Sequence, residues 1–328
     1  MLKYLFFFLF FINESNSFAQ ASLIKEKKIN QGQDLRFYFN TGNQFFKYSK
    51  KKERLITYSQ IAGYAANFAS LYYFWYKDYP LGAFHFFNDN EQYLQVDKVS
   101  HIYGTYVGGK MSIQLWKWAG VPKKKYVWVG GLTGLAYETV IEIMDGFSDK
   151  WGFSIGDYAA NVLGTSILIG QELLWDEQRI QIKYSTHLAK YEPKVVDEHL
   201  NTVYGKTKMK RLLKDYNPQT YWLSFNLKSF FTKSNLPSWL NVTVGYGGQD
   251  MYGVYWDGIL NADNTLAFPE DHFKRYRQWY LAPDIDLTKI KTKSKFLKTA
   301  LLVLNSFKFP APSLELSQGS VKWNWIHF

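Results

Sequence analysis

The hydrophobic period of this 328-residue chain changes near residue 178, and this change most constrains the fold. Before it, apolar residues recur at helical spacing in four segments, at 55–75, 98–120, 126–144 and 155–175. After it, apolar and polar residues alternate with period two, as they do in half-buried strands. We therefore expect an α+β fold, with an N-terminal helical bundle of about four helices followed by antiparallel strands.

The strand-rich segment contains seven predicted strands, which are separated by turn signals such as Gly247-Gly248 and Gln318-Gly319. Their ranges are 179–185, 221–231, 240–247, 278–287, 306–309, 313–317 and 321–328, with one helix expected at 293–304. Two architectures fit, an antiparallel β-sheet docked on the helices or a small outer-membrane-type β-barrel. The many aromatic residues of this segment, and the final Phe328 after an alternating strand, favour association with a membrane.

The first 20 residues have the layout of a secretory signal peptide: Lys3, an apolar core at 4–12, and small residues near Ala19. This core is too short to cross about 30 Å of hydrocarbon. We expect an exported protein of the outer membrane or its periplasmic side. Its expected parts are a signal peptide at 1–20, a polar segment at 21–54, a helical domain at 55–178 and a strand-rich domain at 179–328.

Charge and cysteine content narrow the partners and the chemistry. Lys and Arg number 39 against 28 Asp and Glu, which gives a net charge of +11. In an exported protein this charge suits outer-membrane lipid or lipopolysaccharide rather than nucleic acid, with other envelope proteins as a further class of partner. The same lysines could equally serve only to solvate the surface. Because the chain has no cysteine, disulfides, thiolate metal ligands and a lipid-anchored cysteine are excluded.

Three of the predicted helical segments each carry two polar residues at helical spacing. The pairs are Asp97 with His101, Glu142 with Asp145, and Asp157 with Asn161. Each spacing places both side chains on one face of a helix. Since the surrounding residues are apolar and rich in glycine, we expect the three faces to point toward one another. Lys98, and Ser154 as the N-cap of the last helix, complete this predicted cluster.

The order of these motifs resembles that of an uncharacterised family of predicted periplasmic lipoproteins, domain of unknown function 2279. The motifs are D-K-x-x-H at 97–101, E-x-x-D at 142–145 and W-G-x-S-x-x-D-x-x-x-N-x-x-G at 151–164. The resemblance covers about residues 55–180, and a VanZ-like pattern is similar more distantly. It implies that the motif positions listed above, together with Gly164, are the family's characteristic residues. The missing lipobox cysteine departs from the family, whose activity is unknown.

Several roles are open for the cluster. It can be a buried network that fixes helix register, because an unpaired buried polar group costs about 1–3 kcal/mol. It can hold a divalent metal through His101 with Glu142, Asp145 and Asp157, a set that suits zinc, manganese or iron, or it can bind a small ligand or lipid headgroup. Alternatively, His101 and Glu142 can act as acid and base on an envelope lipid or glycan.

No nucleophile elbow, phosphate loop or dinucleotide fingerprint supports a particular reaction. We therefore expect an exported cell-envelope protein of structural or binding type rather than an enzyme. A divalent metal is the one cofactor that its residues suggest, and a lipid- or glycan-modifying enzyme is the alternative.

Overall fold

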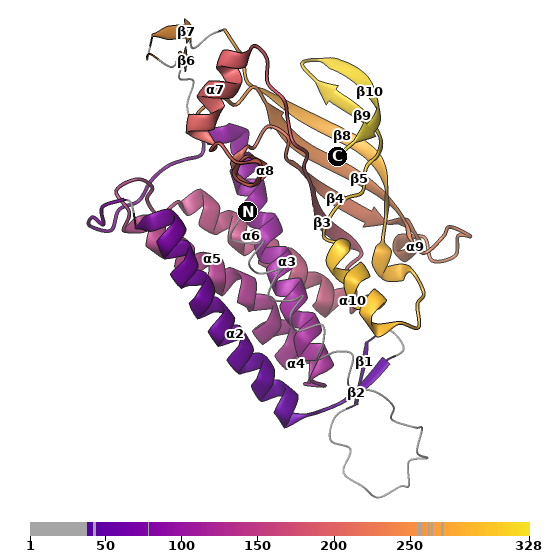
Figure 1. Cartoon of the computed structure of the whole chain (residues 1–328). Coiled ribbons are helices and arrows are strands. Elements are labelled where there is room, and N and C mark those ends of the chain that lie inside the picture. The colour runs from indigo at the N-terminus through magenta and orange to yellow at the C-terminus, as the bar shows by residue number, and fades with distance from the viewer. Residues whose placement is uncertain are drawn as a thin grey trace, which may run out of the picture.

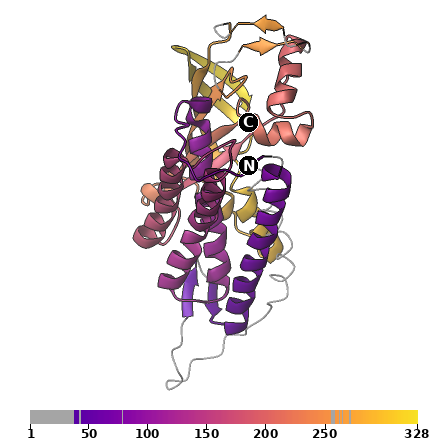
Figure 2. The same ribbon diagram turned by 90° about the vertical axis from the view of Figure 1, so that its left-hand side faces the viewer.

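The computed structural model describes residues 38–41, 44–77, 79–254, 258–261, 263, 265–269 and 272–328. The expected signal peptide at 1–20 lies outside these residues. A bundle of long helices stands beside a curved sheet, and the view in Figure 2 shows the long helices running side by side (Figures 1 and 2). The α+β class predicted from the change of period is confirmed.

Four long helices form the bundle, as the sequence predicted. They are α2 (Lys50–Leu71), α3 (Val96–Trp118), α5 (Gly131–Gly146) and α6 (Ile155–Trp175). Short helical turns adjoin them, namely η1 (Tyr72–Tyr76), η2 (Gln92–Gln95), α4 (Lys123–Lys125) and η3 (Tyr126–Gly130). Ser154 caps α6 as predicted, because its Oγ accepts a hydrogen bond of 3.1 Å from the Asp157 amide.

The strand-rich half contains more helix than the sequence indicated. Its helical elements are α7 (Lys194–Val203), α8 (Lys208–Lys214), α9 (Leu227–Phe230), η4 (Leu287–Lys289) and α10 (Lys295–Leu304). Only α10 was predicted. Helices α8 and α9 are too short for periodicity to distinguish them from loops, whereas α7 is as long as α10 and was missed.

Helix α3 is the centre of the bundle, and glycines let its neighbours approach closely. A Cβ on Gly134 of α5 would lie 2.4 Å from the Thr105 carbonyl oxygen of α3. A Cβ on Gly164 of α6 would lie 2.3 Å from the carbonyl oxygen of Ile102. Both neighbouring helices thus contact α3 within one turn of His101, which is the close packing that small residues predicted.

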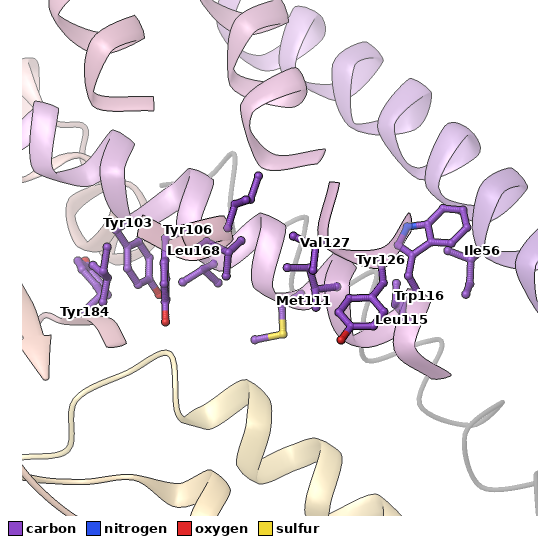
Figure 3. Close-up of a cluster of buried hydrophobic side chains, with 14 of the residues drawn as sticks. Ile56, Tyr103, Tyr106, Met111, Leu115, Trp116, Tyr126, Val127, Leu168 and Tyr184 are labelled. Atoms are coloured by element: carbon purple, nitrogen blue, oxygen red, sulfur yellow. The ribbon is translucent and has the colours of Figure 1, made fainter. Parts of the chain in front are cut away.

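A large apolar cluster continues along α3 and reaches the first strand of the sheet. Figure 3 shows its labelled members: Ile56, Tyr103, Tyr106, Met111, Leu115, Trp116, Tyr126, Val127, Leu168 and Tyr184. Hydrogen bonds cross the same contact, from the Tyr103 hydroxyl to the Ser306 carbonyl (3.2 Å) and from Lys110 Nζ to Gln181 Oε1 (2.8 Å). The helical and strand-rich halves are therefore packed together.

The main sheet has six antiparallel strands in the order β10-β9-β8-β5-β4-β3. The strands are β3 (Ile180–Ser185), β4 (Thr220–Asn226), β5 (Leu240–Gln249), β8 (Tyr276–Ile285), β9 (Ala311–Ser317) and β10 (Ser320–His327). The antiparallel sheet, one of the two expected architectures, is thus confirmed. Two hairpins stand apart from it, β1 (Tyr38–Thr41) with β2 (Gln44–Lys47) and β6 (Ile259–Leu260) with β7 (Leu266–Phe268).

The sheet is strongly curved. Oγ1 of Thr220 in β4 lies 3.2 Å from Nε2 of His327 at the end of β10, although three strands separate β4 from β10. The predicted strand at 306–309 is instead a bridging segment, in which the Ser306 carbonyl accepts from the Tyr184 amide at 3.1 Å. No helix in the described ranges has both the length and the apolar character needed to cross a membrane.

Candidate functional site

The candidate site surrounds His101, a side chain on α3 that is only 7% exposed. Its Nδ1 lies 3.1 Å from Oδ1 of Asn161, and 3.7 Å from carboxylate oxygens of both Glu138 and Glu142. Its Nε2 lies 3.8 Å from Asp97, and 3.9 Å from Asp157. Helices α3, α5 and α6 therefore all deliver polar groups to one imidazole, as the spacing of the motifs predicted.

Lys98 is the second cation of the site. Its Nζ donates to Oδ1 of Asp157 at 2.8 Å and also pairs with Asp89, which precedes α3. The Ser154 hydroxyl donates to Asp89 at 2.7 Å, while the Ser154 amide donates to Oε2 of Glu142 at 3.3 Å. The start of α6 is thereby tied both to α5 and to the loop before α3.

We call this group the His101 cluster and define it by eight residues: Asp89, Asp97, Lys98, His101, Glu138, Glu142, Asp157 and Asn161. Five carboxylates meet two cationic groups, so full ionisation leaves an excess of three negative charges. Such an excess is costly in a buried site unless further positive charge is supplied.

Glu138 is the least satisfied member of the cluster. Its side chain is 1% exposed, and neither carboxylate oxygen accepts a hydrogen bond from a described residue. Nδ2 of Asn161 likewise has no hydrogen-bond partner there. Buried polar atoms are nearly always paired, so a carboxylate without hydrogen bonds beside a histidine is an exception that calls for a ligand or an ion.

The excess negative charge also moves the protonation equilibria. Burial alone would lower the pKa of His101, but the carboxylates, Asp157 and Asp97 first, outweigh burial and raise it to about 9. Burial raises the pKa of Asp157 to about 8, with His101 opposing and Asp97 adding to the shift. The imidazole is therefore protonated at neutral pH when no other cation is present.

The helix that carries His101 begins at an unusual turn. Tyr93, Leu94 and Gln95 have φ values of 46°, 52° and 65°, in the left-handed region that side chains other than glycine rarely adopt. The strand-rich half holds this turn, since the Tyr246 hydroxyl bonds to the Leu94 carbonyl. The Tyr216 hydroxyl donates to Asp97 at 2.5 Å, so the second half also fixes a member of the cluster.

The structure brings most of the predicted site residues together. One connected network of hydrogen bonds and ion pairs links Asp97, Lys98, His101, Glu142, Ser154, Asp157 and Asn161. Asp145 is the exception, because it accepts a 2.5 Å hydrogen bond from Tyr76 instead of facing His101. Sequence reasoning missed Glu138, whose four-residue spacing from Glu142 was a usable signal, and Asp89, which no helical pattern marks.

The cluster contains donors suited to a metal ion. One oxygen each of Asp97 and Asp157 and one nitrogen of His101 all lie within 4.8 Å of one another. A mixed set of imidazole and carboxylate ligands suits zinc, manganese or iron. The carboxylates of Glu138 and Glu142 lie at Nδ1, on the other side of the same imidazole, so they add negative charge beside this donor set without belonging to it.

Comparisons with known proteins agree with the motif analysis. No curated protein and no solved structure matches the chain. The family that the motifs resemble is described as predicted periplasmic lipoproteins, and this description indicates an exported protein of the cell envelope. Residues 85–170, which carry α3, α5, most of α6 and every member of the His101 cluster, match the model of that family, domain of unknown function 2279.

Proposed function

We propose that this exported envelope protein is a binding protein, and that its helical half takes up a divalent cation in the His101 cluster. The single observation that carries this proposal is the buried Glu138 carboxylate, which faces His101 without a hydrogen bond from a described residue. A divalent ion would supply positive charge to a site in which carboxylates outnumber cationic groups by three, and would help to balance the buried Glu138 carboxylate.

Burial favours an ion over a large substrate. His101 and Glu142 are 7% and 2% exposed, so neither presents a reactive atom to a lipid or a glycan at the surface. A register-fixing network, the other interpretation, would be expected to satisfy all of its members, because an incomplete buried network costs stability. Glu138 and Asn161 both depart from that expectation.

Metal analysis tests the proposal. The purified chain is loaded separately with Zn²⁺, Mn²⁺ or Fe²⁺ and dialysed, and bound metal is measured by mass spectrometry. We expect about one ion per chain for at least one metal, and loss of that ion in Glu138→Gln and His101→Gln. Wild-type protein that retains no metal, or Glu138→Gln protein that retains as much as wild type, would contradict the proposal.

Glu172→Gln is the matched control for these variants. Glu172 is another buried carboxylate of α6, 2% exposed, but it pairs with Lys117 at 2.8 Å outside the cluster. Its replacement should leave the metal content unchanged. Circular dichroism of each variant separates loss of the ion from loss of the fold.

We further propose that the protein resides at the outer membrane. The support is the match to a family of predicted periplasmic lipoproteins, together with the apolar side chains that the sheet exposes. Separation of inner and outer membranes on a density gradient, followed by detection of the chain, tests this location. Recovery only in the soluble periplasmic fraction would contradict it.

A further inference from the structure

The sheet exposes an apolar face. On this face, aligned residues of neighbouring strands form three rows, which we call the outer rows. The first contains Tyr246, Trp279, Leu316 and Val321, the second Leu223, Val244, Leu281, Leu314 and Trp323, and the third Phe225, Val242 and Pro283. None of these twelve residues is charged. Trp279, Leu316 and Trp323 are 48%, 51% and 51% exposed.

The opposite face of the same strands is buried and carries many polar side chains around one small apolar cluster, Trp222, Tyr280 and Ala282. Ser224 and Asn241 are fully buried there, and Lys183 forms an ion pair of 2.7 Å with Asp284. An antiparallel sheet in water normally has the reverse arrangement, with apolar side chains packed inward and polar ones outward. The inversion extends over the neighbouring strands β4, β5, β8 and β9, so it is a property of the sheet rather than of single residues.

A basic segment follows the outer rows directly. Residues 287–310, which follow Asp286 and lead from β8 to β9, contain six lysines and no acidic residue. Four of these lysines, at 291, 293, 295 and 298, are exposed. Phe296 and Leu297 of α10 lie among them and are 68% and 44% exposed. Figure 1 shows α10 beside the lower end of the sheet.

We propose that the outer rows contact the acyl chains of an anionic lipid bilayer, and that the lysines at 291, 293, 295 and 298 bind its phosphate groups. Lysines mixed with exposed aromatic and aliphatic residues are typical of segments that lie at the interface of a membrane. Each lysine near an anionic surface adds to the attraction. The apolar rows and this basic segment together match a partner that is apolar inside and negatively charged at its border.

A second copy of the chain fits this surface less well. The outer rows contain no acidic side chain that could receive the lysines of a partner copy. The proposal rests on the envelope location proposed above and names the surface responsible, but it is independent of the cation site. Vesicle binding can fail while membrane fractionation and metal binding succeed, so the failures are distinguishable.

Flotation with lipid vesicles tests the role of the lysines. The full chain is mixed with vesicles of phosphatidylcholine alone or of phosphatidylcholine with phosphatidylglycerol, and the floating fraction is measured. We expect binding to the anionic vesicles, and a loss of at least about tenfold when the four lysines are replaced by glutamine. The charge-matched control replaces four other exposed lysines, Lys190, Lys206, Lys208 and Lys210.

A second pair of variants tests the outer rows. Leu281→Asn with Leu314→Asn places two amides in the central row and should lower binding to the anionic vesicles by a similar factor. Leu188→Asn with Met209→Asn is the control, because these side chains are 51% and 52% exposed but lie outside the sheet. No binding by wild type, equal losses in control and test variants, or a wild-type dimer that the Leu281 and Leu314 variant abolishes would overturn the proposal.

Discussion

The Glu138 carboxylate lies 3.7 Å from Nδ1 of His101, and neither of its oxygens accepts a hydrogen bond within the described part of the chain. Both residues are almost completely buried. Close packing of α5 on α3 holds the pair in place. Gly134, one turn before Glu138, contacts the backbone at Thr105, one turn after His101. His101 is therefore the cation that pairs with Glu138, and a bound metal ion would add further positive charge beside this carboxylate.

Metal should stabilise the wild-type protein through Glu138. A ligand present at about one hundred times its Kd stabilises the folded state by about 2.7 kcal/mol, so thermal unfolding should shift upward by several degrees. In Glu138→Gln the shift should disappear, while the metal-free variant should be no less stable than metal-free wild type, because a buried charge without hydrogen bonds has been removed. Differential scanning calorimetry with and without a chelator measures both quantities. An undiminished metal-induced shift in the variant would show that Glu138 does not contribute to metal binding.

Assembly of the cluster should depend on Gly164 but not on Gly170 of the same helix. An alanine at Gly164 would place its Cβ 2.3 Å from the Ile102 carbonyl oxygen, so α6 must move away from α3. We expect Gly164→Ala to destabilise the protein by about 1–3 kcal/mol. A Cβ on Gly170 would meet no described residue within 4 Å beyond its own stretch of helix, so Gly170→Ala should be neutral or stabilise by up to about 1 kcal/mol. Urea titrations compare the two, and equal effects would contradict the proposed packing.

Much of the fold could be predicted because local signals agreed with the tertiary structure. The helix α6 occupies the predicted range because Ser154 supplies its cap and its apolar residues keep helical spacing. Strands β3, β5 and β8 followed from alternation alone. Alternation shows that the two faces of a strand differ, but it does not tell which face is buried. It therefore could not indicate that the apolar face of the sheet is the exposed one.

The site could be predicted only as far as helical spacing reaches. The three motif helices converge because each carries its polar residues on the face that packs against its neighbours in the bundle. Asp89 enters from a loop, and its position depends on the tertiary fold rather than on spacing. Asp145 has the expected spacing from Glu142 but turns to the hydroxyl of Tyr76, a partner that is 69 residues away in the sequence.

Removing one partner of the ion pair between Lys183 and Asp284 should destabilise the sheet more than removing both. Both side chains are almost fully buried, with exposed fractions of 0% and 1%, and Ser224 also donates to Asp284 at 2.6 Å. Lys183→Met leaves a buried carboxylate without its cation and should cost about 3–5 kcal/mol. The double variant Lys183→Met with Asp284→Leu should recover a large part of that loss, because no buried charge remains unpaired. Chemical denaturation of the three proteins completes the cycle, and additive losses would show that the two charges are not coupled.

Acid should destabilise the folded protein through His327, which lies where the sheet curves back on itself. Burial, with smaller effects from the nearby positive charges of Lys308 and His187 and an opposing one from Glu315, lowers the pKa of this residue from 6.5 to about 4. In the unfolded chain the imidazole takes up a proton below about pH 6.5, whereas in the folded protein it does so only near pH 4. The stabilisation is therefore complete above about pH 6.5 and is lost as the pH falls toward about 4.

The expected loss across this pH range is about 2–3 kcal/mol of unfolding free energy. His327→Phe keeps an aromatic ring against Tyr280, which lies 4.0 Å away between centroids, but cannot be protonated. Urea titrations at several pH values should therefore show a shallower acid dependence for this variant than for wild type between about pH 6.5 and 4. His272→Phe replaces an exposed histidine and serves as the control. Parallel pH profiles for wild type and His327→Phe would mean that His327 is protonated equally in the folded and unfolded states.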